Sequence, residues 1–154
     1  MNTSSTTVQF FPATNGAVVN EQGLVLLTQR SEKVRAPGYW CLPGGHLDPG
    51  ETWLDGCRRE LREEVGIEVV GGELLGIYSD PATNVVPHPG SASGMGQFLT
   101  AVFIFRAYAG EIRPNEEVQQ YRWVAPRSPP GPLISSHYVR LEDLGAFQGR
   151  SFFR

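Results

Sequence analysis

The sequence predicts an α/β or α+β fold with a mixed sheet flanked by helices. Short apolar runs bounded by turn residues indicate strands, and two stretches with helical periodicity are interspersed among them. The chain has 154 residues, of which 40% are hydrophobic, and a chain of this size normally builds one domain around one core. We therefore expect residues 1–154 to form a single domain.

Strands are predicted wherever apolar and β-branched residues form a run between turn residues. These runs are residues 16–19, 24–27, 39–42, 67–70, 73–78, 98–109 and 121–124. The first two flank Asn20 and Gly23, which is typical of a β-hairpin. Residues 1–15 are predicted to be a polar, flexible lead-in, within which residues 8–11 are compatible with a short strand. Residues 79–96, rich in Pro, Gly and Ser, are predicted to be a long loop that is either functional or disordered.

Two helices are predicted. The first carries an apolar stripe at helical spacing and has Thr52 as its N-cap and Gly66 at its C-terminal end. The stripe consists of Leu54, Cys57, Leu61 and Val65. The second helix is expected over residues 136–147, with Tyr138, Leu141 and Leu144 as its apolar positions.

The overall charge argues against two classes of partner. A net charge of −3, from 13 basic and 16 acidic residues, gives no electrostatic basis for binding a long nucleic acid or a membrane surface. No apolar stretch approaches the roughly 18 residues that a membrane-spanning helix needs. The two cysteines, Cys41 and Cys57, are typical of a reduced cytoplasmic protein. We expect a cytoplasmic protein that acts on a small molecule.

The segment from Gly45 to Ile67 is rich in acidic residues. Glu60, Glu63 and Glu64 are spaced i, i+3 and i+4, so they share one face of the predicted helix. Three like charges on one face repel each other, and a bound Mg²⁺ or Mn²⁺ would compensate them with hard oxygen ligands. The alternative is a solvated helix face held by salt bridges.

The order of residues in this segment distinguishes the two interpretations. It reads Gly45-x5-Glu51-x7-Arg59-Glu60-Leu61-x-Glu63-Glu64-x-Gly66-Ile67. This pattern resembles the complete box of the Nudix hydrolase family, and the order of the flanking elements is similar as well. The resemblance implies an αβα sandwich, a divalent metal ion and hydrolysis of a pyrophosphate linkage in a nucleoside diphosphate derivative.

The resemblance also implies roles for individual residues. Metal ligands are expected at Glu60 and Glu64, with help from Glu63 and the carbonyl group of Gly44. Glu51 and Arg59 would shape the loop before the helix. One more acid is expected from a later loop, either Glu116 or Glu117, of which we favour Glu117. Which acid serves as general base is left open.

Substrate choice must come from residues outside the box. The run from Tyr39 to Trp53 resembles the MutT-like, nucleoside triphosphate pyrophosphatase branch, which implies conversion of a (d)NTP to a (d)NMP and pyrophosphate. An ADP-ribose or nucleotide-sugar pyrophosphatase is the alternative, suggested by Pro81 shortly after the box. A nucleotide-binding module without catalysis is the alternative from a different class, but it would lack box carboxylates, and none is missing here.

Four side chains are candidates for contacting the nucleotide. The aromatic rings of Tyr39, Tyr78 and Phe98 could stack on a base. His46 lies in the turn beside the predicted metal site, where it could reach a phosphate. The family resemblance is also compatible with a homodimer.

Overall fold

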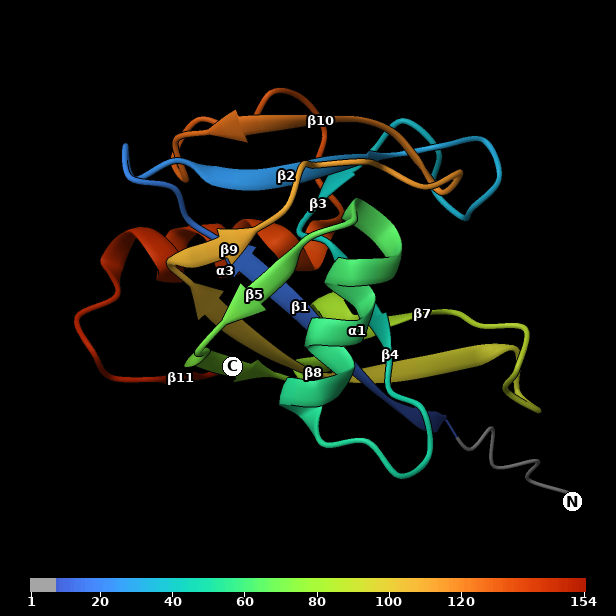
Figure 1. The fold of residues 1–154 in the computed structure, drawn as a ribbon. Helices are drawn as coiled ribbons and strands as arrows, with labels where there is room; N and C mark the ends of the chain where they lie inside the picture. The colour runs from blue at the N-terminus through green and yellow to red at the C-terminus, as the bar shows by residue number, and fades with distance from the viewer. Residues whose placement is uncertain (1–7) are drawn as a thin grey trace, which may run out of the picture.

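The computed structural model describes residues 8–154, and its strands and helices alternate along the chain as expected (Figure 1). The elements are β1 (Gln9–Val18), β2 (Val25–Arg30), β3 (Trp40–Cys41), β4 (Gly44–His46), α1 (Trp53–Val65), β5 (Glu68–Val70), β6 (Glu73–Tyr78), α2 (Pro81–Asn84), β7 (Val85–Pro87), β8 (Met95–Phe105), β9 (Ala107–Ala109), β10 (Val118–Val124), α3 (Ser135–Ala146) and β11 (Phe152–Phe153). Among the residues described, no helix is long and apolar enough to cross a membrane.

The largest sheet is mixed, with the strand order β11-β6-β8-β1-β4 and with β7 paired to β8. At its centre β1 and β8 run parallel and pair along ten residues of β1, from Gln9 opposite Gly96 to Val18 opposite Phe105. A second sheet has the order β10-β2-β3, and β5 pairs with β9. The β4 strand is antiparallel to β1, which places the turn before α1 against the central strand.

The core has two parts, one on each side of β1 and β2. Successive residues of β1 alternate between them, because side chains of a strand point to opposite faces. Val18 packs in the cluster with Leu61 of α1, whereas Ala17 packs in the cluster with Leu141 of α3. Figure 1 shows α1 in front of the strands and α3 behind them. The predicted αβα sandwich is therefore confirmed.

Two predictions about the N-terminal region need correction. A strand is present where residues 8–11 were compatible with one, but it is the start of β1, which begins at Gln9 and continues through the rest of the predicted lead-in; residues 1–7 lie outside the described part. The predicted hairpin is not a regular one, because β1 and β2 belong to different sheets and a single bridge joins Val19 to Val25. Both errors arise because β1 pairs with β8. That strand lies far along the chain, so the local sequence around β1 does not indicate the pairing.

The predicted loop over residues 79–96 is partly ordered into regular structure. It holds the short helix α2, whose first turn is capped by the Asp80 carboxylate accepting from the Ala82 amide, followed by β7. Strand β8 then begins at Met95, and the predicted strand over residues 98–109 is interrupted at Arg106. These elements form one wall of the cleft described next.

Candidate active site

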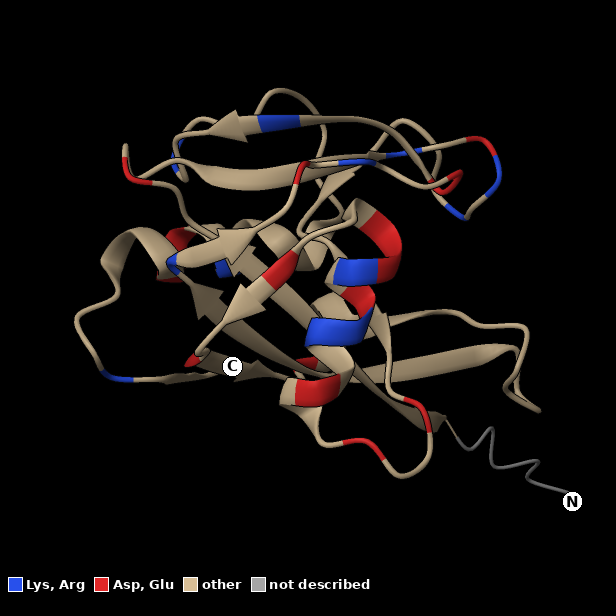
Figure 2. Ribbon diagram, in the orientation of Figure 1, with Lys and Arg blue, Asp and Glu red and all other residues tan. Residues whose placement is uncertain are grey.

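Helix α1 is fixed at both ends by the residues that the sequence indicated. The Thr52 hydroxyl accepts a hydrogen bond from the Asp55 amide at 3.1 Å. Gly66 adopts a left-handed conformation with φ 75° and donates to the Arg62 carbonyl at 3.1 Å. Leu61 is fully buried in the core. Acidic and basic residues alternate along α1 (Figure 2), and of the acidic ones Glu64 is buried.

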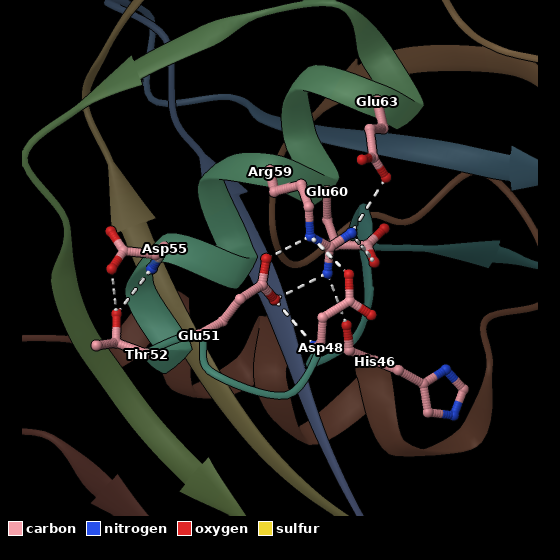
Figure 3. A network of polar contacts seen from close by, with 8 residues as sticks. All are labelled: His46, Asp48, Glu51, Thr52, Asp55, Arg59, Glu60 and Glu63. Carbon is pink, nitrogen blue, oxygen red and sulfur yellow. Dashed lines mark hydrogen bonds and ion pairs between the residues drawn. The ribbon is translucent and has the colours of Figure 1, made fainter.

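Arg59 holds the acidic loop and the acidic helix together (Figure 3). Its Nε and Nη2 donate to the two carboxylate oxygens of Glu51, at 2.5 and 3.0 Å. Nη1 donates to Glu60 at 3.0 Å and to Glu63 at 3.1 Å, and Nη2 also reaches the His46 carbonyl at 3.0 Å. These bonds raise the pKa of Arg59 and lower that of Glu51. Arg59 thus fixes the loop in the way a bidentate guanidinium pair allows.

Glu64 is the most deeply buried acid of the helix, with 8% of its surface exposed. Its carboxylate accepts hydrogen bonds from the Gly44 amide at 2.9 Å and from the Thr28 hydroxyl at 3.2 Å. Burial, together with the negative charges of Glu60 and Glu117, raises the pKa of Glu64 to about 7. Burial also raises the pKa of Glu60. Neighbouring carboxylates repel one another because they carry like charges. A divalent cation bound by their oxygens would offset this repulsion.

The Gly44-Gly45 turn lies directly against these carboxylates. Gly44 has φ 149°, and a Cβ there would be 2.1 Å from the Thr14 carbonyl oxygen. A Cβ on Gly45 would be 2.6 Å from Glu60 Oε1. Gly44 therefore requires glycine, because a side chain would displace the backbone of β1, whereas a side chain at Gly45 would displace the Glu60 carboxylate.

The loop before β10 adds a further acid to the site. Its backbone is anchored to α1, because the Asn115 amide donates to the Glu64 carbonyl at 2.9 Å. Glu117 lines the cleft beside the helix acids. Glu116 instead pairs at 2.5 Å with Lys33 on the exposed surface. Of the two acids considered from the sequence, Glu117 is the one that faces the site.

A cleft of about 590 Å³ runs from these acids across the end of the sheet, which is within the size range of ligand sites. Glu60, Glu63 and Glu117 line one end. Within residues 8–154, no three acidic, histidine or cysteine side chains are grouped so that they could already hold a metal ion. Glu60 and Glu63 are engaged by Arg59 in this arrangement, so ligation would require their carboxylates to turn toward Glu64.

Two of the four predicted nucleotide contacts lie in the cleft. Phe98 and His46 both line it, with ring centroids 5.2 Å apart. His88 completes this aromatic wall, because its Nε2 lies 3.1 Å from that of His46 and its ring stacks on Phe11 at 3.7 Å. The sequence had not indicated His88, since it falls in the segment predicted to be a loop.

The other two predicted contacts do not lie in the cleft. The Tyr39 side chain is on the surface, and Tyr39 does not line the cleft. The prediction for Tyr78 was wrong, because its ring is fully buried in the core and its hydroxyl donates to Asp143 at 3.0 Å. Tyr78 belongs to the packing between β6 and α3 and has no face exposed for stacking.

A buried polar cluster, not foreseen from the sequence, also lines the cleft. It consists of Asn15, Asn84, His137 and Arg140, which we call the distal cluster. The helix over residues 136–147 was predicted to have an apolar face that included Tyr138, but Tyr138 is 52% exposed. His137 and Arg140 lie on the same buried helical face as Leu141. Their helical spacing relative to Leu141 was the signal in the sequence that could have indicated this cluster.

Comparison with known proteins agrees with this geometry. The model of the NUDIX domain family matches residues 9–144. The chain is 30% identical over 128 residues to a MutT-like protein of Streptomyces ambofaciens, covering 83% of this chain and 72% of that one. It is 29% identical over 110 residues to the nucleoside triphosphatase NudI of Escherichia coli, covering 71% and 77%.

The fold is shared with solved structures too. The crystal structure of a MutT NUDIX hydrolase from Burkholderia pseudomallei superposes with a TM-score of 0.72 at 28% identity, covering 88% of this chain and 98% of that one. The chain therefore belongs to the Nudix family and is a Nudix hydrolase of the MutT-like branch.

Proposed function

We propose that this chain hydrolyses the pyrophosphate linkage of a nucleoside diphosphate derivative in the presence of Mg²⁺ or Mn²⁺, and that its preferred substrate is a (d)NTP. The products would be a (d)NMP and pyrophosphate. The observation that carries the proposal is Glu64, a buried carboxylate whose neighbour Glu60 lines a nucleotide-sized cleft. A buried acid facing a second acid is poorly stabilised without a cation.

The residues that would hold the ion are the acids at this end of the cleft and one backbone oxygen. They are Glu60, Glu63, Glu64, Glu117 and the carbonyl of Gly44. When bound, such an ion lowers the pKa of a coordinated water and neutralises charge on the phosphates. The oxygen-only ligand set suits Mg²⁺ or Mn²⁺ better than a thiophilic metal.

The protein's own groups position these ligands. Arg59 keeps Glu60 and Glu63 on the cleft side of α1, while Glu51 orients Arg59 from the loop. The Gly44 amide fixes one oxygen of Glu64. In the reaction the water oxygen bonds to phosphorus, the P–O bond to the leaving group breaks, and the water proton passes to a carboxylate of this group. Catalysis would rest mainly on positioning and electrostatics.

Support for a triphosphate substrate comes from the relatives, since NudI of E. coli is named as a nucleoside triphosphatase. The Tyr39–Trp53 segment, which resembles the MutT-like branch, contains the Gly44-Gly45 turn that contacts Glu60 and Glu64. Cys41 and Cys57 are both buried free thiols, so we propose a reducing, cytoplasmic location.

A hydrolysis screen tests the proposal directly. The purified chain is incubated with Mg²⁺ and, in parallel, with (d)NTPs, ADP-ribose, nucleotide sugars and dinucleoside polyphosphates. Release of pyrophosphate and a nucleoside monophosphate from a (d)NTP is the expected result. Cleavage of ADP-ribose alone would replace the triphosphate by that alternative, and binding without cleavage of any substrate would indicate a nucleotide-binding module.

A pair of adjacent acids tests the proposed metal site. Glu117→Gln should lower kcat and raise the Mg²⁺ concentration needed for half-maximal activity, because Glu117 lines the cleft. Glu116→Gln makes the same chemical change one residue away, on the exposed surface, and should leave both values unchanged. Equal effects in the two variants would remove Glu117 from the site.

A further inference from the structure

The distal cluster contains a buried positive charge without a negative partner. Arg140 is 3% exposed, and none of the ion pairs within 4.0 Å in the described part of the chain involves it. Its guanidinium carbon lies 5.4 Å from the centroid of the Tyr78 ring, which carries no formal charge. Burial lowers the pKa of Arg140 to about 10, so it stays charged at neutral pH. A buried cation without a counter-ion is costly, and this one lines the same cleft as Glu60 and Glu63.

Two neutral amides hold the guanidinium in place. Arg140 Nη1 donates to Asn15 Oδ1 at 2.6 Å, and Nη2 donates to Asn84 Oδ1 at 3.0 Å. The amide nitrogens point elsewhere, from Asn15 to the Leu42 carbonyl at 3.2 Å and from Asn84 to the Asp80 carbonyl at 3.0 Å. Both amide oxygens therefore accept a hydrogen bond from Arg140, and the N–H groups of both amides are directed away from the guanidinium.

His137 is held neutral beside this cation. Its Nδ1 accepts a hydrogen bond from the Leu42 amide at 3.0 Å, so the ring proton is on Nε2. That Nε2 faces Arg140 Nη1 at 3.0 Å, where two donors meet and no hydrogen bond forms. Burial and the charge of Arg140 keep the pKa of His137 well below its usual range. His137 thus offers Arg140 no acceptor.

The balance of donors and acceptors determines what the cluster can bind. The amide oxygens and His137 Nδ1 are already engaged. Arg140 Nη2 carries two N–H groups and donates to a single acceptor, Asn84, among the described residues, whereas the unpaired Nε is itself buried. The cluster consequently presents N–H donors and positive charge to a ligand. A ligand group that meets it favourably must be a hydrogen-bond acceptor.

We propose that Arg140 is a specificity-determining residue that donates to an oxo group of the nucleobase, so that the enzyme prefers oxo-edged bases to amino-edged ones. The inference rests on the proposed function and adds to it that, with the phosphates at the acids, the base meets the distal cluster, which lines the same cleft. Hypoxanthine and uracil present a carbonyl oxygen where adenine and cytosine present an amino group. An amino group facing Arg140 would leave donors on both sides without acceptors, which is the strongest basis for rejecting a close analogue.

Two matched substrate pairs test this without any mutation. ITP differs from ATP, and dUTP from dCTP, mainly at the group in question, so the purine and pyrimidine pairs also show which ring size the cleft takes. We expect kcat/KM to favour the oxo partner by roughly tenfold or more in at least one pair, as an arginine contact to a base edge usually does. Equal values, or a preference for the amino partner, would overturn the inference while leaving hydrolysis established.

A variant locates the preference at Arg140. Arg140→Met should bring the oxo-to-amino ratio of kcat/KM close to one, whereas a merely structural defect would lower both values alike and keep their ratio. Arg150→Met makes the same change at an exposed arginine and should keep the wild-type ratio. A wild-type ratio in folded Arg140→Met would assign the preference to another residue and overturn the proposal for Arg140.

Product binding separates this inference from the proposed function. IMP and AMP, and likewise dUMP and dCMP, are titrated into the wild-type protein without added metal, and their dissociation constants are compared by calorimetry. Tighter binding of the oxo partner in at least one pair supports the inference whether or not a triphosphate is cleaved, and covers the case in which Arg140→Met fails to fold. Equal or weaker binding of the oxo partner in both pairs contradicts it, whereas failure to cleave any pyrophosphate linkage contradicts the proposed function alone.

Discussion

Glu64→Gln isolates the energetic effect of a carboxylate that is buried next to other acids. An exposed glutamate titrates near 4.5, but burial and the charge of Glu60 raise the pKa of Glu64 to about 7. The folded state therefore binds this proton more tightly than the unfolded chain does. Its stabilising contribution is fully present below pH 4.5 and is lost as the pH rises through 7.

The size of this effect follows from the two pKa values. Each unit of difference corresponds to 1.36 kcal/mol, so the change from 4.5 to about 7 gives a loss of roughly 3 kcal/mol in the free energy of unfolding between low and high pH. Glutamine has nearly the same shape and no charge to desolvate. The metal-free Glu64→Gln protein should consequently lack most of this loss.

The assay is urea denaturation in the presence of EDTA at pH 5 and pH 8. Glu73→Gln serves as the control, because it removes the same charge at an exposed position and should follow the wild type. Added Mg²⁺ should stabilise the wild type at pH 8 but have little effect on Glu64→Gln, whose kcat should fall by more than the roughly 10- to 100-fold expected for losing an outer-shell partner. Parallel pH dependence in wild type and variant would refute the reasoning.

Three further variants probe the loop, the network and the core. Gly45→Ala would bring a Cβ to 2.6 Å from Glu60 Oε1, so kcat should fall while circular dichroism shows an intact fold; an unchanged kcat would contradict this. Arg59→Lys cannot keep the bidentate geometry, and we expect kcat to fall roughly 10- to 100-fold, whereas Arg62→Lys, a surface substitution, should leave activity unchanged. Tyr78→Phe removes a buried hydrogen bond and should destabilise by about 1–2 kcal/mol in urea without changing KM; a raised KM would return Tyr78 to the substrate site.

The helix and its acidic loop could be predicted because their determinants are local. Thr52 and Gly66 mark the ends of α1, and each acts through a hydrogen bond to a residue within one turn. The spacing of Glu60 and Glu64 on one face follows from helical geometry alone. The direction of Glu117 could not be derived in that way, since it depends on the anchoring of its loop to the carbonyl of Glu64.

The distal cluster is formed by contacts between distant parts of the chain. Asn15 and Arg140 meet at 2.6 Å although 125 positions separate them, and no periodicity in either segment encodes that contact. Tyr78 was misassigned for the same reason, because an aromatic residue in a strand looks alike whether it faces a cleft or Asp143 in the core. The parallel pairing of β1 with β8 was likewise invisible to local pattern.

Asn15 connects the distal cluster to the Gly44 turn, through its side chain on one side and its backbone on the other. Its amide nitrogen donates to the Leu42 carbonyl at 3.2 Å and lies 3.4 Å from that of Pro43, while its oxygen accepts from Arg140. Its backbone pairs with Gly44, whose amide holds Glu64. Because β1 is paired with β8 along its whole length, the distal cluster and the Gly44 turn are both fixed to one rigid strand. Such rigid elements hold reacting groups within the small tolerances that catalysis needs, so a base bound at Arg140, as proposed, would set the position of the phosphates.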